Sequence, residues 1–375
     1  MKIVFTGGGT GGHFYPIIAV AQAINRLVEE KKLVEAKLYY LAPEPYDSHL
    51  LFEQRIEFHR VSAGKWRRYF SFRNFPDMLK NLGGFLLALW KLYTIYPDVV
   101  FSKGGYASFP TLLASRVLKI PVVIHESDSH PGRVSLWSAK FAQRIALSYP
   151  EALQYFPREK TALTGNPIRE ELLNPISRGA HEFLELSDSL PILFITGGSQ
   201  GASFLNEVVL DILPSLLEHY QVIHQVGKDN FAEINQRAWT IMEKSQYRDR
   251  YKLFAQLNST ALRMMAGVTE LVISRAGSAI FEIAAWALPA IIVPIPEPIS
   301  HDQRTNAFTY ARSGAAVVIE QVNLTPSVLL SEINRLMSDK TLREKMIAGA
   351  KNFAQPEASR AIADEILTLA LEHEL

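Results

Sequence analysis

The residues best suited to chemistry stand in three glycine-containing segments, each directly after an apolar run. They are GGGTGGH at residues 7–13, GGSQGA at residues 197–202 and SRAGS at residues 274–278. Glycines after a strand let the backbone turn sharply and approach a diphosphate, whose charge meets backbone N–H groups and the positive end of the next helix. A single segment of this kind is often only a tight turn, but three together favour phosphate binding.

His13 closes the first segment and is the candidate general base. A neutral imidazole can take a proton from a hydroxyl near neutral pH. Two nearby carboxylates in the later segment HESD, Glu126 and Asp128, are alternative bases. A purely structural alternative is that His13 packs in the first turn of a helix.

The first segment also fits a different class of enzyme. Gly7, Gly9 and Gly12 match the dinucleotide-binding pattern, and Glu44 lies near the end of the second expected strand. A dehydrogenase would not need the second glycine segment, whereas a sugar-nucleotide site shared between two lobes would. The pattern therefore favours a sugar-nucleotide enzyme over a dehydrogenase.

Length and composition indicate a globular protein of two domains. The chain has 375 residues, 48% hydrophobic and 21% charged, with a net charge of +1 and no cysteine. Disulfides, thiolate metal sites and a cysteine nucleophile are excluded. The small net charge gives no general argument for nucleic acid binding.

Apolar runs alternate with helical patterns in each half, as in βαβ units with parallel strands. The first half has expected strands at residues 2–5, 37–41, 99–101, 122–124 and 145–147, and the second half at residues 192–196, 221–225, 271–274, 290–294 and 315–319. We expect an α/β fold with one domain at residues 1–166 and a second at 167–356. A break near residues 354–356 predicts a last helix, about residues 357–375, that packs back on the first domain. No apolar run is long enough to predict a membrane span.

The ordered segments GGGTGGH, HES, TGNPIR, GGSQGA, SRAGS, FEIAAWALPAI and HDQRTNA closely resemble the MurG family. That resemblance implies the glycosyltransferase B fold, with two Rossmann-like domains facing across a cleft. It implies an acceptor- and membrane-binding N-terminal domain and a C-terminal domain for the UDP-sugar. The implied activity is inverting transfer of N-acetylglucosamine from UDP-N-acetylglucosamine to the 4-hydroxyl of N-acetylmuramic acid in lipid I, which forms lipid II.

The resemblance also implies roles for particular residues. His13 would be the base, with Glu126 as the weaker candidate; Arg169 would contact the diphosphate, Glu282 the ribose and Gln303 the donor sugar. Arg169 in a hinge salt bridge and Glu282 as a solvated helix residue are the alternatives. The donor-binding set comprises Thr10, Gly11, Gly12, Asp128, Arg169, Ser199, Gln200, Gly201, Ser278, Glu282, Gln303 and Asn306. Asp128 stands where the family usually has asparagine, and an ionised carboxylate can only accept hydrogen bonds.

No cofactor and no metal is expected, because in this family the protein's own donors neutralise the diphosphate. His301 and Asp302 alone are too few ligands for a metal site.

Basic and aromatic residues alternate between residues 65 and 96. Such a mixture suits reversible attachment to an anionic membrane surface. The expected membrane contacts are Trp66, Arg67, Arg68, Phe70, Phe72, Phe85, Leu89 and Trp90. Core packing and single-stranded nucleic acid are the alternatives. With a lipid-linked acceptor, we expect a peripheral enzyme at the cytoplasmic face of the cell membrane.

Three other functions remain open from the sequence. They are a transferase of the same fold with another lipid acceptor, a UDP-sugar epimerase, and a sugar-nucleotide-binding subunit without catalysis. Products formed from the donor alone or with each acceptor distinguish them.

Overall fold

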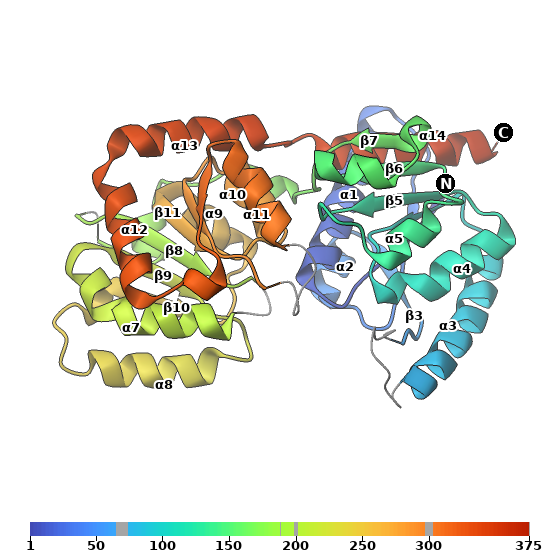
Figure 1. Ribbon diagram of the computed structural model, residues 1–375. Coiled ribbons are helices and arrows are strands. Elements are labelled where there is room, and N and C mark those ends of the chain that lie inside the picture. Colours follow the sequence, from blue (N-terminus) through green and yellow to red (C-terminus); the bar gives the residue numbers. More distant parts are fainter. Residues whose placement is uncertain (65–73, 188, 199–201, 297–302, 375) are drawn as a thin grey trace. The chain divides into compact units, whose positions relative to one another are not determined.

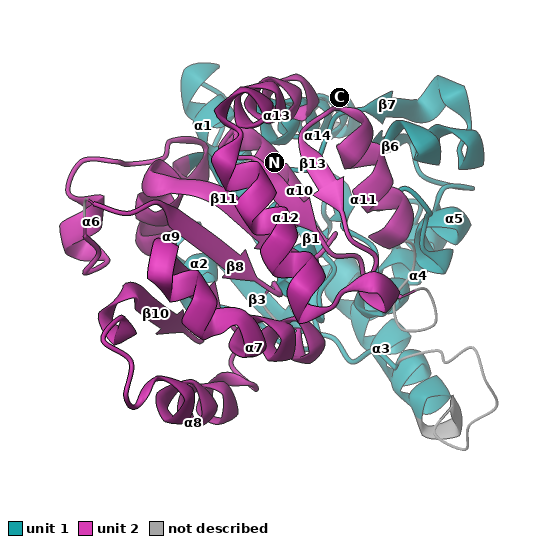
Figure 2. Cartoon of the chain, turned by 60° about the vertical axis from the view of Figure 1, so that its left-hand side comes forward, with its two compact units in different colours: residues 1–170, 355–375 teal, residues 171–354 magenta. Residues whose placement is uncertain are grey.

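A computed structural model describes residues 1–64, 74–187, 189–198, 202–296 and 303–374 of the chain. The chain divides into two compact units, which Figure 2 colours separately: residues 1–170 with 355–375 form unit 1, and residues 171–354 form unit 2. The first division lies four residues after the expected boundary at residue 166, and the second lies two residues before residue 356.

Among its described residues, unit 1 contains a parallel sheet of seven strands in the order β3-β2-β1-β4-β5-β6-β7. The strands are β1 (Lys2–Thr6), β2 (Lys37–Ala42), β3 (Ile56–Arg60), β4 (Val99–Ser102), β5 (Val122–Glu126), β6 (Arg144–Leu147) and β7 (Thr161–Leu163). Its α-helices are α1 (Gly11–Glu30), α2 (Ser48–Glu53), α3 (Asn74–Ile95), α4 (Phe109–Leu118), α5 (Arg133–Ser138) and α14 (Ala358–Glu374). Figure 1 labels most of them.

Unit 2 contains a parallel sheet of six strands over the part of it that is described, in the order β10-β9-β8-β11-β12-β13. The strands are β8 (Ile192–Thr196), β9 (Gln221–Gln225), β10 (Tyr251–Phe254), β11 (Thr269–Ser274), β12 (Ala290–Ile292) and β13 (Ala316–Val318). The helices are α6 (Ala180–Phe183), α7 (Ser203–His219), α8 (Phe231–Met242), α9 (Ser259–Val268), α10 (Ala279–Ala285), α11 (Gln303–Arg312), α12 (Pro326–Ser338) and α13 (Lys340–Phe353).

Helices cover both faces of each sheet, which is why its central strands are apolar on both sides. In β1, Ile3 and Phe5 pack in a core with α1, α2 and α14, whereas Val4 packs in the opposite core with α3 and α4. Unit 2 is built in the same way. Residues of β8 alternate between a core with α7, α8 and α12 and a core with α9, α10 and α11. The predicted α/β class is confirmed.

Every strand expected from the apolar runs is present, but the sequence missed β3, β7 and β10. All three are edge strands. They are short and carry polar or exposed residues, as in IEFHR and TAL. An edge strand is not enclosed by neighbours on both sides, so it lacks the continuous apolar run that marks a central strand.

The C-terminal helix belongs to unit 1. Helix α13 ends at Phe353 and α14 begins at Ala358. Ile362 and Ile366 of α14 are buried in the same core as α1. Arg360 also pairs with Glu30 near the end of α1, at 2.7 Å. Among the described residues, no helix is sufficiently long and apolar to cross a membrane.

Two adjacent glycines of α3 provide a test of how this helix packs. A Cβ on Gly84 would lie 1.8 Å from the backbone oxygen of Ser62, whereas a Cβ on Gly83 would meet nothing within 4 Å. We expect Gly84→Ala to lower the free energy of unfolding by about 2 kcal/mol or more, because backbone must move. Gly83→Ala is the matched control and should raise it by up to about 1 kcal/mol, since alanine favours the helix. Urea unfolding of the two variants measures both effects, and equal effects would contradict this packing.

Candidate functional site

The first glycine segment joins β1 to α1, and His13 lies in the first turn of that helix. The Thr10 side chain does not cap the helix. Its Oγ1 instead lies 2.9 Å from Nδ1 of His13. If Nδ1 carries the hydrogen and donates it to Thr10, Nε2 is left as the proton acceptor. Thr10 therefore orients the ring of the predicted base.

The other side of the imidazole faces the loop that follows β4, which contains Gly104 and Gly105. A Cβ on Gly105 would lie 3.3 Å from Nε2 of His13, and Gly105 itself has a φ of +77°. Burial and the Lys103 ammonium lower the pKa of His13 from 6.5 to about 4. His13 is therefore neutral at physiological pH, which is the form that a general base requires.

Lys103 is the buried cation of this region. It follows β4, is only 2% exposed, and its backbone N–H donates to the Thr6 oxygen at 3.0 Å. Burial lowers the pKa of Lys103 to about 8, against the opposing effect of Glu126 and Asp128. The amine is thus mostly charged at neutral pH.

Glu126 ends β5 and holds the loop that follows. Its Oε1 accepts from the Asp128 N–H at 3.1 Å, and its Oε2 accepts from the Gly132 N–H at 3.0 Å. Both carboxylate oxygens therefore bind backbone amides of the loop. This arrangement favours a structural role for Glu126 and leaves His13 as the stronger base candidate.

Arg169 lies one residue before the end of the first segment of unit 1, residues 1–170, and is buried. Its guanidinium lies 4.3 Å from the ring centre of Tyr15, two residues after His13 in α1. Tyr15 in turn meets Tyr46 edge to face. The cation–π contact fixes the orientation of Arg169, the residue predicted to bind the diphosphate, relative to α1.

In unit 2, Gln303 and Asn306 at the start of α11 hold the loop that follows β11. The Gln303 Oε1 accepts from the N–H groups of Ala276 and Ile295, each at 3.2 Å. The Asn306 amide donates to the Ala276 oxygen at 3.3 Å. Both residues thus fix the SRAGS segment, and Gln303 keeps its NH₂ group as a donor.

The same loop leads into α10, which carries two further predicted donor contacts. Ser278 precedes the helix and Glu282 lies in its first turn, and both are half-buried. The guanidinium of Arg275, between them and β11, donates to the Val293 oxygen at 3.1 Å. Ser199, Gln200 and Gly201 of the second glycine segment lie outside the described residues, as do His301 and Asp302.

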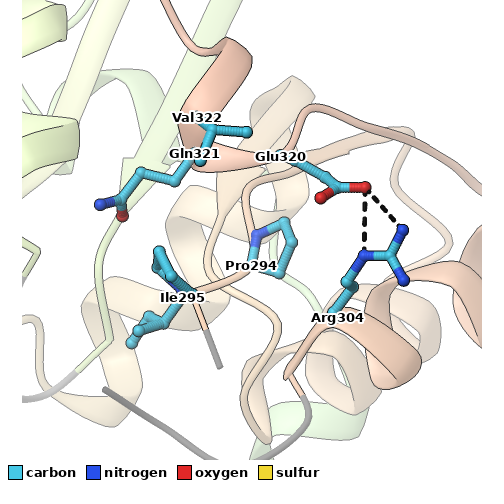
Figure 3. A pocket seen from close by; sticks show the side chains of 7 residues that line it. Pro294, Ile295, Arg304, Glu320, Gln321 and Val322 are labelled. Atoms are coloured by element: carbon cyan, nitrogen blue, oxygen red, sulfur yellow. Dashed lines mark hydrogen bonds and ion pairs between the residues drawn. The ribbon is translucent and has the colours of Figure 1, made fainter. Parts of the chain in front are cut away.

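A pocket of about 330 Å³, shown from close by in Figure 3, is lined by residues of α11 and of the segments that follow β12 and β13. Its lining residues are Pro294, Ile295, Pro296, Arg304, Glu320, Gln321 and Val322. Glu320 accepts from Nε and a terminal nitrogen of Arg304, at 3.1 and 3.0 Å. Because these two charges pair, this pocket offers no net positive charge to a diphosphate.

The described residues contain no group of three or more histidine, aspartate and glutamate side chains that could hold a metal ion. The absence of a required metal remains a prediction from the sequence.

Helix α3 has an exposed apolar face, which we call the α3 stripe: Leu79, Leu82, Leu86, Trp90 and Tyr93. Their spacing of three and four residues puts them on one side of the helix. Phe85 and Leu89, predicted as membrane contacts, are instead half-buried against the core of unit 1. Trp66, Arg67, Arg68, Phe70 and Phe72 lie outside the described residues.

The structure brings the predicted residues together in two groups. The first group lies at the start of α1 in unit 1 and comprises Thr10, Gly11, Gly12 and His13. The charge of Lys103 acts on the pKa of His13, and the charges of Glu126 and Asp128 act on the pKa of Lys103. Ser278, Glu282, Gln303 and Asn306 gather around the SRAGS loop in unit 2. The sequence analysis missed Lys103, although a lysine between a buried strand and the pair Gly104-Gly105 was a usable signal. It also missed Tyr15, whose role depends on a contact with the distant Arg169.

Comparisons with known proteins match both halves of the chain to one family of enzymes. Residues 3–147 match the glycosyltransferase family 28 N-terminal domain, and residues 192–362 match the family 28 C-terminal domain. A Treponema denticola protein named UDP-N-acetylglucosamine--N-acetylmuramyl-(pentapeptide) pyrophosphoryl-undecaprenol N-acetylglucosamine transferase is 34% identical, over 97% of this chain and 94% of its own.

Two solved structures are also similar. The crystal structure of Acinetobacter baumannii MurG has a TM-score of 0.70 and 25% identity, covering 98% of this chain and 99% of its own. A Neisseria meningitidis UDP-GlcNAc 2-epimerase, solved with UDP-GlcNAc, has a TM-score of 0.68 and 14% identity, covering 98% of this chain and 100% of its own. At that identity the epimerase indicates only a shared fold.

The role of Glu126 can be tested by its neutral amide. Glutamine at this position keeps one acceptor oxygen and replaces the other with a donor, so one loop N–H loses its partner. We expect Glu126→Gln to lower the free energy of unfolding by about 1–3 kcal/mol. Hydrogen exchange should also accelerate at Asp128 or Gly132, whichever amide loses its acceptor. The matched control is Glu29→Gln at an exposed position of α1, which should change stability by less than about 0.5 kcal/mol. Unchanged exchange at both amides would contradict the structural role.

Proposed function

The chain belongs to the MurG family of glycosyltransferases, and we propose that it transfers N-acetylglucosamine from UDP-N-acetylglucosamine to the 4-hydroxyl of N-acetylmuramic acid in lipid I. The product is lipid II, formed with inversion at the anomeric carbon. The carrying observation is 34% identity to a transferase of this name over 97% of the chain. The fold is the glycosyltransferase B fold, consistent with two family 28 domains and two Rossmann-like units.

His13 supplies the base in this proposal. The acceptor oxygen forms a bond with the anomeric carbon while the bond from that carbon to the UDP oxygen breaks. The hydroxyl proton passes to Nε2 of His13, and UDP leaves with the bonding electron pair. Thr10, at 2.9 Å from Nδ1, holds the imidazole and stabilises its charged form by a hydrogen bond.

Arg169 and unit 2 bind the donor in this proposal. The guanidinium of Arg169 is buried and stacked on Tyr15, so it is pre-oriented for two parallel hydrogen bonds to phosphate oxygens. In unit 2, the free NH₂ donors of Gln303 bind sugar hydroxyls, and the carboxylate of Glu282 accepts from the ribose hydroxyls. Ser199, Gln200 and Gly201 complete the diphosphate site, with Thr10, Gly11, Gly12, Asp128, Ser278 and Asn306 as further donor contacts.

The α3 stripe is the proposed membrane contact, at the cytoplasmic face where lipid I would be presented. Leu82, Leu86 and Trp90 are each more than half exposed. Lys91 lies 5.2 Å from the ring centre of Trp90 and places a cation beside the apolar face. Apolar side chains with neighbouring cations suit an anionic lipid surface.

Radiolabelled UDP-N-acetylglucosamine tests the activity. With lipid I as acceptor, we expect label in lipid II. Label in glycosylated diacylglycerol would favour another lipid acceptor, and conversion of the donor alone would favour an epimerase. If wild-type protein binds UDP but yields none of these products, the chain is a binding subunit and the proposal is wrong.

The pH dependence of that transfer tests the base. Only neutral His13 accepts a proton, and its pKa is about 4, so kcat/KM should hold from pH 7 to about 5 and fall as the pH drops through about 4. His13→Gln should lower kcat by about 100-fold or more and remove this acid limb. Glu126→Gln should lower the rate yet keep the limb at the same pH. A limb that disappears only in Glu126→Gln would assign the base to Glu126.

The α3 stripe is tested by sedimentation with phosphatidylglycerol vesicles. Replacing Leu82, Leu86 and Trp90 by serine together should weaken binding by tenfold or more, since each apolar side chain contributes about 1 kcal/mol or more when buried in lipid. Phe52→Ser is the matched control, because Phe52 is 82% exposed on α2, away from α3 in sequence. Equal loss of vesicle binding in the control would contradict a specific α3 contact.

A further inference from the structure

Lys103 is the least compensated charge among the described residues of the His13 region. Its side chain is 2% exposed, and its Nζ has no hydrogen-bond partner within the described part of the chain. A buried ammonium without hydrogen bonds is costly for the folded protein. Buried charges of this kind concentrate at functional sites, which makes Lys103 a candidate for binding a ligand.

The neighbouring charges balance Lys103 without bonding to its Nζ. Glu126 and Asp128 raise the pKa of Lys103 and so favour its charged form. The charge of Lys103 in turn lowers the pKa values of His13 and His125 and favours their neutral forms. Both oxygens of Glu126 are already bonded to the amides of Asp128 and Gly132. The lysine therefore keeps its charge and its donor hydrogens.

The backbone around Lys103 is rich in glycine and closely packed. Gly7 lies against the lysine, since a Cβ there would be 3.1 Å from the Lys103 Cβ. Gly104 and Gly105, which follow it, have φ angles of +79° and +77°. The start of α1, uncapped by the Thr10 side chain, adds the positive end of a 20-residue helix. Ammonium, glycine backbone and helix end together suit an anion with several oxygens.

We propose that Lys103 binds an oxygen of a substrate diphosphate, as a specificity-determining residue of the transfer reaction. This inference rests on the proposed function, in which the donor and the lipid-linked acceptor each contain a diphosphate. The shared chemistry is one ammonium donating to a phosphate oxygen. The two substrates are distinguished by experiment.

A ligand role has an effect on stability that a structural role lacks. If Lys103 holds the fold together, its removal lowers stability and activity together. If it serves a ligand, the free protein carries an uncompensated buried charge. Replacing that charge by an apolar side chain of similar length should then leave stability equal or higher while transfer falls.

Lys103→Met and Lys103→Arg test the proposal, with Lys140→Met at an exposed position of unit 1 as the control. We expect kcat/KM to fall about 10- to 100-fold in Lys103→Met, the range for a lost hydrogen bond to a charged group. The KM that rises, for UDP-N-acetylglucosamine or for lipid I, identifies the diphosphate concerned. The urea midpoint of Lys103→Met should match or exceed that of the wild type, and arginine should restore part of the rate.

A second measurement does not depend on turnover. Inorganic pyrophosphate should raise the melting temperature of the wild type and of Lys140→Met, and raise it less in Lys103→Met. This arm still decides the role of Lys103 if wild-type protein transfers no sugar, which would overturn the proposed function alone. Unchanged kcat/KM for both substrates in Lys103→Met, or equal pyrophosphate effects in the wild type and Lys103→Met, would overturn the inference.

Discussion

The pairing of β1 with β4 is the constraint on which the site of unit 1 depends. At its end, the Lys103 N–H donates to the Thr6 oxygen at 3.0 Å. Beyond this bond the two chain segments separate, since α1 packs in one core and α4 in the opposite core. In an open parallel sheet, ligands bind where neighbouring strands send their chains to opposite faces. His13, Lys103 and Gly105 come together because they follow these two strands.

Side-chain oxygens hold the backbone of the loops that carry the predicted site residues in both units. Glu126 accepts two loop amides in unit 1, and Gln303 accepts two in unit 2. Glu126 joins two positions of the loop that follows β5. Gln303 joins the loop after β11 to the segment after β12. Loops fixed in this way lose little conformational freedom when a substrate binds, which leaves more of the interaction energy for affinity and catalysis.

The charge state of the site follows from burial. A pKa of about 4 makes His13 a weaker base than free imidazole, yet keeps it wholly in the neutral form at physiological pH. The same burial leaves the Lys103 amine charged, because its pKa of about 8 is still above neutral pH. One environment thus leaves two neighbouring basic side chains in different charge states, a neutral imidazole and a charged ammonium, which is how folded proteins fit neighbouring groups for different roles.

The sequence by itself determined the central strands, the two-domain organisation and the family, because buried parallel strands are apolar on both faces and the ordered glycine segments are specific together. It also indicated His13, Arg169, Gln303 and Asn306, whose types suit the chemistry. Only the tertiary structure decided that Glu126 holds a loop, that Tyr15 stacks on Arg169, and that Leu82 and Leu86 rather than Phe85 and Leu89 face outward on α3. These outcomes depend on which distant residues meet. Helical spacing gives the faces of α3 but not which one packs on the sheet. The glycines after Lys103 mark a loop, but not the strand that its backbone meets, which lies almost a hundred residues away in the sequence.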